Sequence, residues 1–112
     1  MIIKFPTRLK YSKENPLVNF FEKCMKTAFN DGIDGVDVTA FSVNIKDYSK
    51  LKKLLHKHLK INYPNLSHKK RSFEVGLILL DIGPRVDKNV KVGTVEINEN
   101  VVYAKNFKNY II

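Results

Sequence analysis

The chain of 112 residues has a single cysteine, Cys24, and lacks any apolar run long enough to span a membrane. A lone cysteine cannot form an internal disulfide, so we expect a protein of the reducing cytoplasm. A membrane helix needs roughly 18 or more consecutive apolar residues, and the sequence predicts neither such a helix nor a membrane partner. The N-terminal stretch reaches Lys4 and Pro6 too early for a secretory signal, so no targeting segment is expected.

Motifs that bind nucleotides or carry acyl transfer are absent from the sequence. It contains no glycine-rich phosphate loop, no Gly-x-Gly-x-x-Gly and no Gly-x-Ser-x-Gly. His56 and His58 are two positions apart on a predicted helix and point about 200° away from each other, so they cannot share a metal ion. We therefore predict no catalytic residue, no cofactor, no metal site and no small-molecule substrate.

Two helices are predicted from their apolar spacing and their end signals. Asn15 is a good N-cap and Pro16 fits the first helical position, which indicates a helix over 16–30. Cys24 falls on the apolar side of this helix and is expected to be buried. Asp47 or Ser49 is predicted to cap a second helix that ends near residue 60.

Strands are expected over 2–10, 36–45, 73–82, 90–97 and 101–107. The predicted order is therefore β-α-β-α-β-β-β, within a single α+β domain that comprises residues 1–112. Short connections between the last three strands imply a mostly antiparallel sheet, with two helices on one face. Pro6 indicates that the first strand lies at a sheet edge or breaks at this residue, whereas residues 73–82 are apolar on both faces and are expected at the centre. Residues 110–112 are apolar and are predicted to close the core or to dock on a partner.

Positive charge is concentrated in one part of the chain, the basic segment 46–71. This segment has nine Lys or Arg residues and one acid, Asp47, so it carries +8 (nine minus one) of the net charge of +9. Lys and Arg that neutralise phosphates release condensed counterions, which gives affinity for nucleic acid without base reading. Aromatic and imidazole rings among the charges would stack on the bases of a single strand. The predicted nucleic-acid contacts are Lys46, Lys50, Lys52, Lys53, Lys57, Lys60, Tyr63, His68, Lys69, Lys70 and Arg71.

The predicted function is that of a non-enzymatic accessory protein that binds single-stranded DNA or RNA. Such a protein would serve as a subunit of a larger replication or processing enzyme. The first alternative is an interaction subunit or inhibitor whose basic face meets an acidic surface of a partner protein. A lysine-rich face that only keeps the protein soluble would explain the charge as well, although solubilising surfaces normally mix both signs.

A small nuclease or RNase toxin is the second alternative. Two-metal nuclease sites use carboxylates from adjacent strands, and the candidates are Glu74, Asp81, Asp87 and Glu96. The small basic chain that ends in antiparallel strands is similar to the ribosome-dependent RNase toxins, a resemblance that would assign the chemistry to Arg71, Arg85 and Tyr103. The strand expected between the two helices is extra to that family's order, and no C-terminal basic and aromatic signature aligns with it.

Overall fold

The computed structural model describes residues 1–30 and 40–98. These residues form three helices and four short strands, which confirms the α+β class. The predicted strand 101–107 and the apolar residues 110–112 lie outside the described residues. In chain order the elements are β1 (Ile2–Lys4), α1 (Pro16–Asn30), β2 (Phe41–Val43), α2 (Ile45–Asn62), α3 (His68–Ile82), β3 (Arg85–Val86) and β4 (Thr94–Ile97).

The four strands form one mixed sheet in the order β1-β4-β2-β3. β4 runs antiparallel to both of its neighbours, β1 and β2, whereas β2 runs parallel to β3. β1 therefore lies at the edge that Pro6 predicted. The regular pairing ends at Lys4, although the Phe5 N–H still donates to the Gly93 carbonyl over 2.8 Å. The expected strand 2–10 is thus much shorter than predicted, because proline cannot donate to a ladder.

Helix α3 replaces the central strand predicted over 73–82, and that prediction is wrong. A short apolar run has the same appearance in a buried strand and in a helix, so periodicity alone could not separate them. The helix begins earlier, at Ser67, whose hydroxyl accepts the Lys70 N–H over 3.2 Å. It ends at Gly83, directly before Pro84. Lys70 and Arg71 consequently lie in the first turn of a helix and not in a loop.

The other boundaries differ from the predictions for local reasons. Asn44 caps α2 in place of Asp47 or Ser49, because its side-chain oxygen accepts the Lys46 N–H over 3.0 Å. The predicted strand 36–45 is described only from residue 40 and is paired over Phe41–Val43. The predicted strand 90–97 begins only at Thr94, since Gly93 adopts a φ of 85° in the turn before it.

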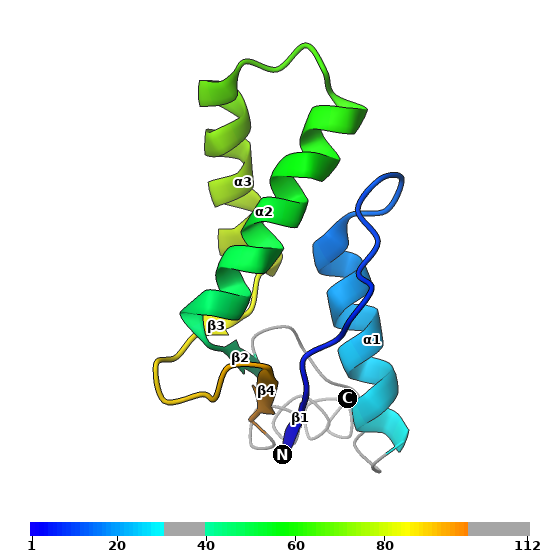
Figure 1. The fold of residues 1–112 in the computed structure, drawn as a ribbon, viewed down its shortest axis with the longest axis vertical. Coiled ribbons are helices and arrows are strands. Elements are labelled where there is room, and N and C mark those ends of the chain that lie inside the picture. The colour runs from blue at the N-terminus through cyan, green and yellow to red at the C-terminus, as the bar shows by residue number, and fades with distance from the viewer. Residues whose placement is uncertain (31–39, 99–112) are drawn as a thin grey trace, which may run out of the picture.

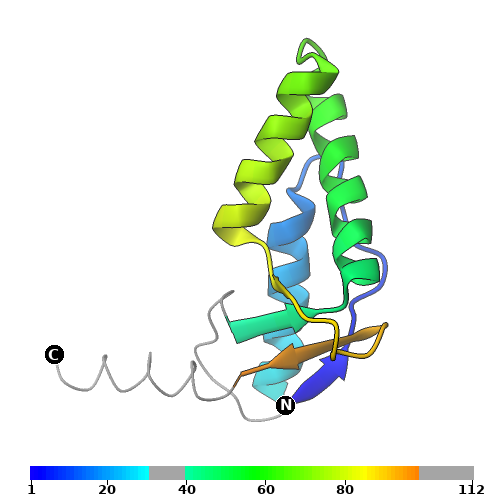
Figure 2. The same ribbon diagram turned by 90° about the vertical axis from the view of Figure 1, so that its left-hand side faces the viewer.

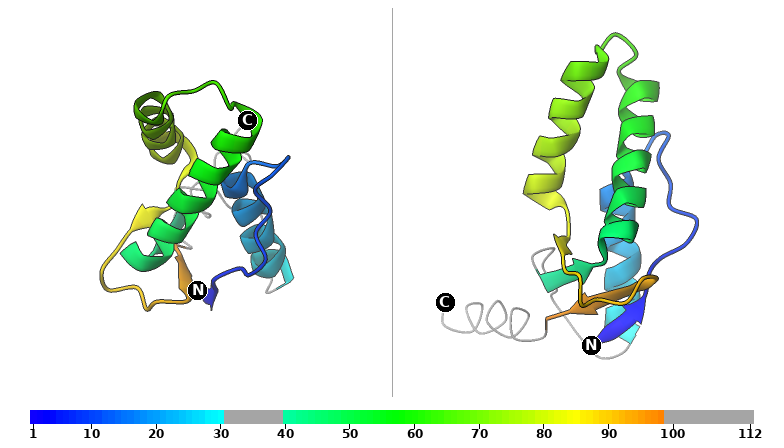
Figure 3. Two further views of the ribbon diagram at one scale, coloured as in Figure 1. Left: turned by 45° about the horizontal axis from the view of Figure 1, so that its top comes forward. Right: turned by 60° about the vertical axis from the view of Figure 1, so that its left-hand side comes forward.

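The helices stand on the sheet as a layer of their own. Figure 1 shows α2 and α3 rising from the sheet as an antiparallel hairpin, with α1 beside α2. Figures 2 and 3 show the sheet at the base and α3 at the outside of the helical layer. No helix within the described ranges is long and apolar enough to cross a lipid bilayer.

Most of the buried apolar residues in the described ranges form a cluster between α1, the sheet and the lower part of the α2–α3 hairpin. Phe41 of β2 packs edge to face against Phe20 of α1, with 6.2 Å between the ring centroids. α2 contributes Leu51, Leu55 and Leu59, and α3 contributes Val75 and Leu79. Residues 60–70, at the top of the hairpin, are exposed except for the half-buried Leu66. The hairpin therefore carries much of the basic segment away from the core and into solvent.

Candidate nucleic-acid interface

The outward side of α2 carries a straight row of lysines, here called the lysine row. Its members recur every three or four residues, a spacing that keeps side chains on one side of a helix. The opposite side of α2 supplies the buried leucines of the core. At 1.5 Å per residue, the row is about 21 Å long. The lysine row consists of Lys46, Lys50, Lys53, Lys57 and Lys60, all of them exposed.

The one acid of the basic segment, Asp47, lies beside this row but not on its exposed side. Its side chain is fully buried, and its Oδ2 accepts a hydrogen bond from the Gly93 N–H over 2.7 Å. Its Oδ1 lies 3.6 Å from the Lys50 Nζ. Asp47 therefore offsets part of the charge of Lys50, while α2 presents no acid on its outward side.

A second group of cations lies where α2 meets the first turn of α3. The rings of His56 and His68 stack with 6.4 Å between their centroids. Burial lowers the pKa of His56, and the positive charges of Lys52, His68 and Arg71 lower it further. His56 therefore resists protonation, because another positive charge is unfavourable in this position.

Arg71 differs from the other predicted contacts because it is partly buried. Its Nη2 donates to the Leu66 carbonyl over 3.3 Å, which ties α3 to the turn that follows α2. Its Nε is buried and has no hydrogen-bond partner within residues 1–30 and 40–98. The predicted phosphate clamp at Arg71 is thus also a structural contact of the hairpin.

The remaining predicted contacts are exposed at the top and outside of the hairpin. Tyr63 lies just past the end of α2 and exposes more than half of its surface. Lys69 and Lys70 lie in the first turn of α3, and Lys52 is exposed on another side of α2 than the lysine row. All eleven predicted residues therefore belong to the α2–α3 hairpin, but they point to more than one side of it.

A basic hollow of about 830 Å³ opens beside the start of the lysine row. Sequence reasoning missed it, because its walls come from the N-terminal segment, α1 and α2, which are distant in the sequence. Lys50 belongs to both the row and the hollow, so the two basic surfaces are continuous. Five cations and one acid line the hollow: Lys4, Arg8, Lys23, Lys26 and Lys50, with Asp47.

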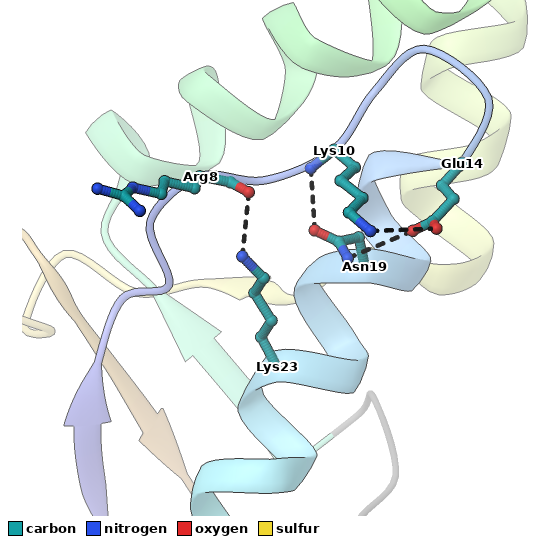
Figure 4. Close-up of polar contacts among 5 residues, drawn as sticks. All are labelled: Arg8, Lys10, Glu14, Asn19 and Lys23. Atoms are coloured by element: carbon teal, nitrogen blue, oxygen red, sulfur yellow. Dashed lines mark hydrogen bonds and ion pairs between the residues drawn. The ribbon is translucent and has the colours of Figure 1, made fainter.

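The N-terminal segment that forms one wall of the hollow is held against α1 by polar contacts (Figure 4). The Lys23 Nζ donates to the Thr7 carbonyl over 2.8 Å and to the Arg8 carbonyl over 3.0 Å, and Figure 4 draws the second of these contacts. The Lys10 N–H donates to the Asn19 Oδ1 over 2.9 Å. Arg8 has a φ of 55°, a conformation uncommon for residues other than glycine. Its side chain points away from Lys23 and remains exposed.

The carboxylates considered for a nuclease are separated by the fold. Glu74 and Asp81 lie on α3, whereas Asp87 and Glu96 lie at the sheet. Within the part of the chain that the structure describes, no three His, Cys, Asp or Glu residues lie close enough together to hold a metal ion. Tyr103, named for the RNase-toxin alternative, lies outside the described residues.

No protein-family model, curated protein or solved structure matches this chain. The functional interpretation therefore depends on the geometry and charge of the described residues.

Proposed function

We propose that the protein is a non-enzymatic nucleic-acid-binding accessory, which holds single-stranded DNA or RNA along the α2–α3 hairpin. The observation that carries the proposal is the lysine row, together with the burial of Asp47, the one acid among these cations. A row on a single helix face can contact successive phosphates of one strand. A solubilising surface would instead mix acids with the lysines.

The physical basis of the binding is counterion release. Each phosphate that a lysine neutralises frees condensed cations, and the affinity then falls steeply as salt is added. The basic hollow extends the same surface beyond Lys50, toward Lys4 and Lys26. Contacts of this kind read no base sequence, so we propose that a larger replication or processing enzyme supplies the chemistry and the choice of site.

The preference for single strands is supported by the top of the hairpin. Tyr63 is exposed there, and Lys69 and Lys70 lie close to it in sequence, in the first turn of α3. An exposed aromatic ring can stack on an unpaired base, which contributes about 1–3 kcal/mol in proteins that bind single strands. The paired and stacked bases of a duplex offer no such contact. We therefore expect Tyr63→Ala to weaken single-strand binding more than duplex binding.

Fluorescence anisotropy with labelled single-stranded DNA, single-stranded RNA and duplex DNA tests the proposal. If four to six phosphates of a single strand are contacted, a slope of about 0.7 per phosphate predicts a loss of affinity of roughly 50- to 350-fold between 50 and 200 mM salt. Absence of binding to all three probes at 50 mM salt would contradict the proposal. It would favour an acidic protein surface as the partner.

A matched pair of variants separates the lysine row from net charge. One variant replaces Lys46, Lys53 and Lys60 of the row by Gln, and the control replaces Lys13, Lys88 and Lys91, which are exposed elsewhere. Both lower the net charge from +9 to +6 by removing three lysines. The row variant is expected to lose most of the affinity and to show a shallower salt slope. Equal losses in the two variants would show that the row is not the binding site.

A further inference from the structure

The outer side of α3 carries an apolar stripe that the described part of the chain leaves in solvent. Phe73 is 66% exposed, Leu77 is 45% exposed and Leu80 is 85% exposed. Their spacing of four and three residues places them on one side of the helix. The opposite side packs inward through Val75 and Leu79. Three large apolar side chains in one stripe form a contiguous exposed surface of the kind that marks an interaction site.

The charges beside this stripe oppose the dipole of their own helix. α3 has no acid in its first turn and no base in its last turn. Lys70 instead lies at the positive N-terminal end, and Asp81 lies near the negative C-terminal end. Such an arrangement is unfavourable for an isolated helix. It becomes favourable when a second such helix lies alongside in the opposite direction, because the basic N-terminal end of each helix then lies beside the acidic C-terminal end of the other.

We propose that α3 packs antiparallel against α3 of a second copy of this chain, across a two-fold axis that passes near Gly76. In this register Phe73 of one copy lies against Leu80 of the other, and the two Leu77 side chains meet close to the axis. Lys70 and Asp81 lie on the same flank of the stripe at 3.6 residues per turn. A two-fold interface is self-complementary, so Lys70 of each copy faces Asp81 of the other and the ion pair forms twice.

Gly76 is consistent with close packing at this point of α3. A Cβ at this position would meet no heavy atom within 4 Å in the described part of a single copy. Glycine inside an exposed helix is unfavourable relative to alanine, and no contact among residues 1–30 and 40–98 requires it. Beside a two-fold axis, however, the missing side chain allows two helices to approach each other. The second copy thus gives Gly76 a structural role.

The dimer does not depend on the proposed nucleic-acid binding, because the lysine row belongs to α2 and the stripe belongs to α3. Sedimentation equilibrium of the full chain, without nucleic acid, tests it over about 5 to 500 µM, since the dimer fraction follows mass action. A reversible monomer–dimer equilibrium is the expected result. A chain that remains monomeric throughout this range would overturn the proposal, and the stripe would then belong to another partner or another segment.

Phe73→Gln and Phe29→Gln provide a matched test of the stripe. Both phenylalanines are 66% exposed, but Phe29 lies on α1. Phe73→Gln is expected to weaken dimerisation at least about tenfold, because the ring leaves a buried contact of the interface. Phe29→Gln should leave the dimerisation constant unchanged. A dimer that tolerates Phe73→Gln would show that the chains associate through another surface.

A charge exchange tests the antiparallel register. Lys70→Asp and Asp81→Lys each place like charges opposite one another, so each should weaken the dimer, whereas the double variant should restore it. Both changes agree with the dipole of α3, so helix loss would not explain a weakened dimer. Circular dichroism checks that each variant remains folded. Failure of the double variant to recover would overturn the Lys70–Asp81 pairing and the register with it.

Discussion

Asp47 and Gly93, 46 residues apart in the sequence, are joined by a hydrogen bond of 2.7 Å between the Asp47 Oδ2 and the Gly93 N–H. Asp47 lies in the first turn of α2 and Gly93 in the turn before β4. The contact fixes the start of the lysine row relative to the sheet. Asp47 thus helps to position α2, while it offsets part of the positive charge of Lys50.

Asp47→Ala is expected to lower the free energy of unfolding by about 2–3 kcal/mol. It removes a hydrogen bond from the Gly93 N–H to a buried, charged acceptor, which ties α2 to the turn before β4. Urea denaturation followed by circular dichroism measures the change. Glu22→Ala, at an exposed acid of α1, is the control and should change stability by less than about 0.5 kcal/mol. Similar losses in both variants would refute a specific role for Asp47.

Two glycines of the α3 region should respond oppositely to alanine. At Gly83 a Cβ would lie 2.4 Å from the Leu79 carbonyl oxygen, so Gly83→Ala forces the backbone to shift and should destabilise the fold by about 1–3 kcal/mol. At Gly76 a Cβ would meet no heavy atom of the described residues within 4 Å, so Gly76→Ala should stabilise the fold by up to about 1 kcal/mol. Denaturation at dilute protein concentration, where the monomer is studied, compares them. A stabilising Gly83→Ala would contradict the helix end described here.

Cys24 should be unreactive toward thiol reagents in the native protein. Its side chain is fully buried in the core cluster, and burial raises the pKa of the thiol to about 12, so little thiolate forms at neutral pH. Labelling with a chromogenic disulfide reagent at pH 8 is expected to be slow in buffer and stoichiometric in guanidinium. Rapid labelling without denaturant would show that α1 opens readily from the core.

Stability should fall as the pH is lowered from about 7 to 5, in part because of His56. Burial and the charges of Lys52, His68 and Arg71 lower its pKa below the ordinary 6.5, so the unfolded state binds more protons in this range. The contribution of His56 to the free energy of unfolding is therefore present at neutral pH and is lost on acidification. Urea denaturation at several pH values checks the effect, and His56→Gln should flatten the dependence. An unchanged slope in that variant would exclude His56 as its source.

Local signals predicted α1 well. The helix expected over 16–30 is observed as Pro16–Asn30, and Asn15 accepts the Leu17 N–H as its cap over 2.9 Å. Capping and helix periodicity act within a few residues of one another, so the sequence contains them directly. The same reasoning failed for 73–82. Ser67 and Gly83–Pro84 are the start and end signals of a helix, but the apolar run between them resembles a buried strand. Both faces of that run are indeed apolar, but one packs on the core and the other is exposed.

The sequence by itself determined the charge of the basic segment, the place of α1 and the burial of Cys24, because composition and short-range spacing are properties of the chain. Only the tertiary structure decided that the lysines form one row, that Asp47 is turned inward and that a basic hollow continues the row. It also separated the carboxylates of the nuclease alternative and left Phe73, Leu77 and Leu80 in solvent. These outcomes depend on which residues from distant parts of the chain meet, and packing between elements, not local spacing, selects them.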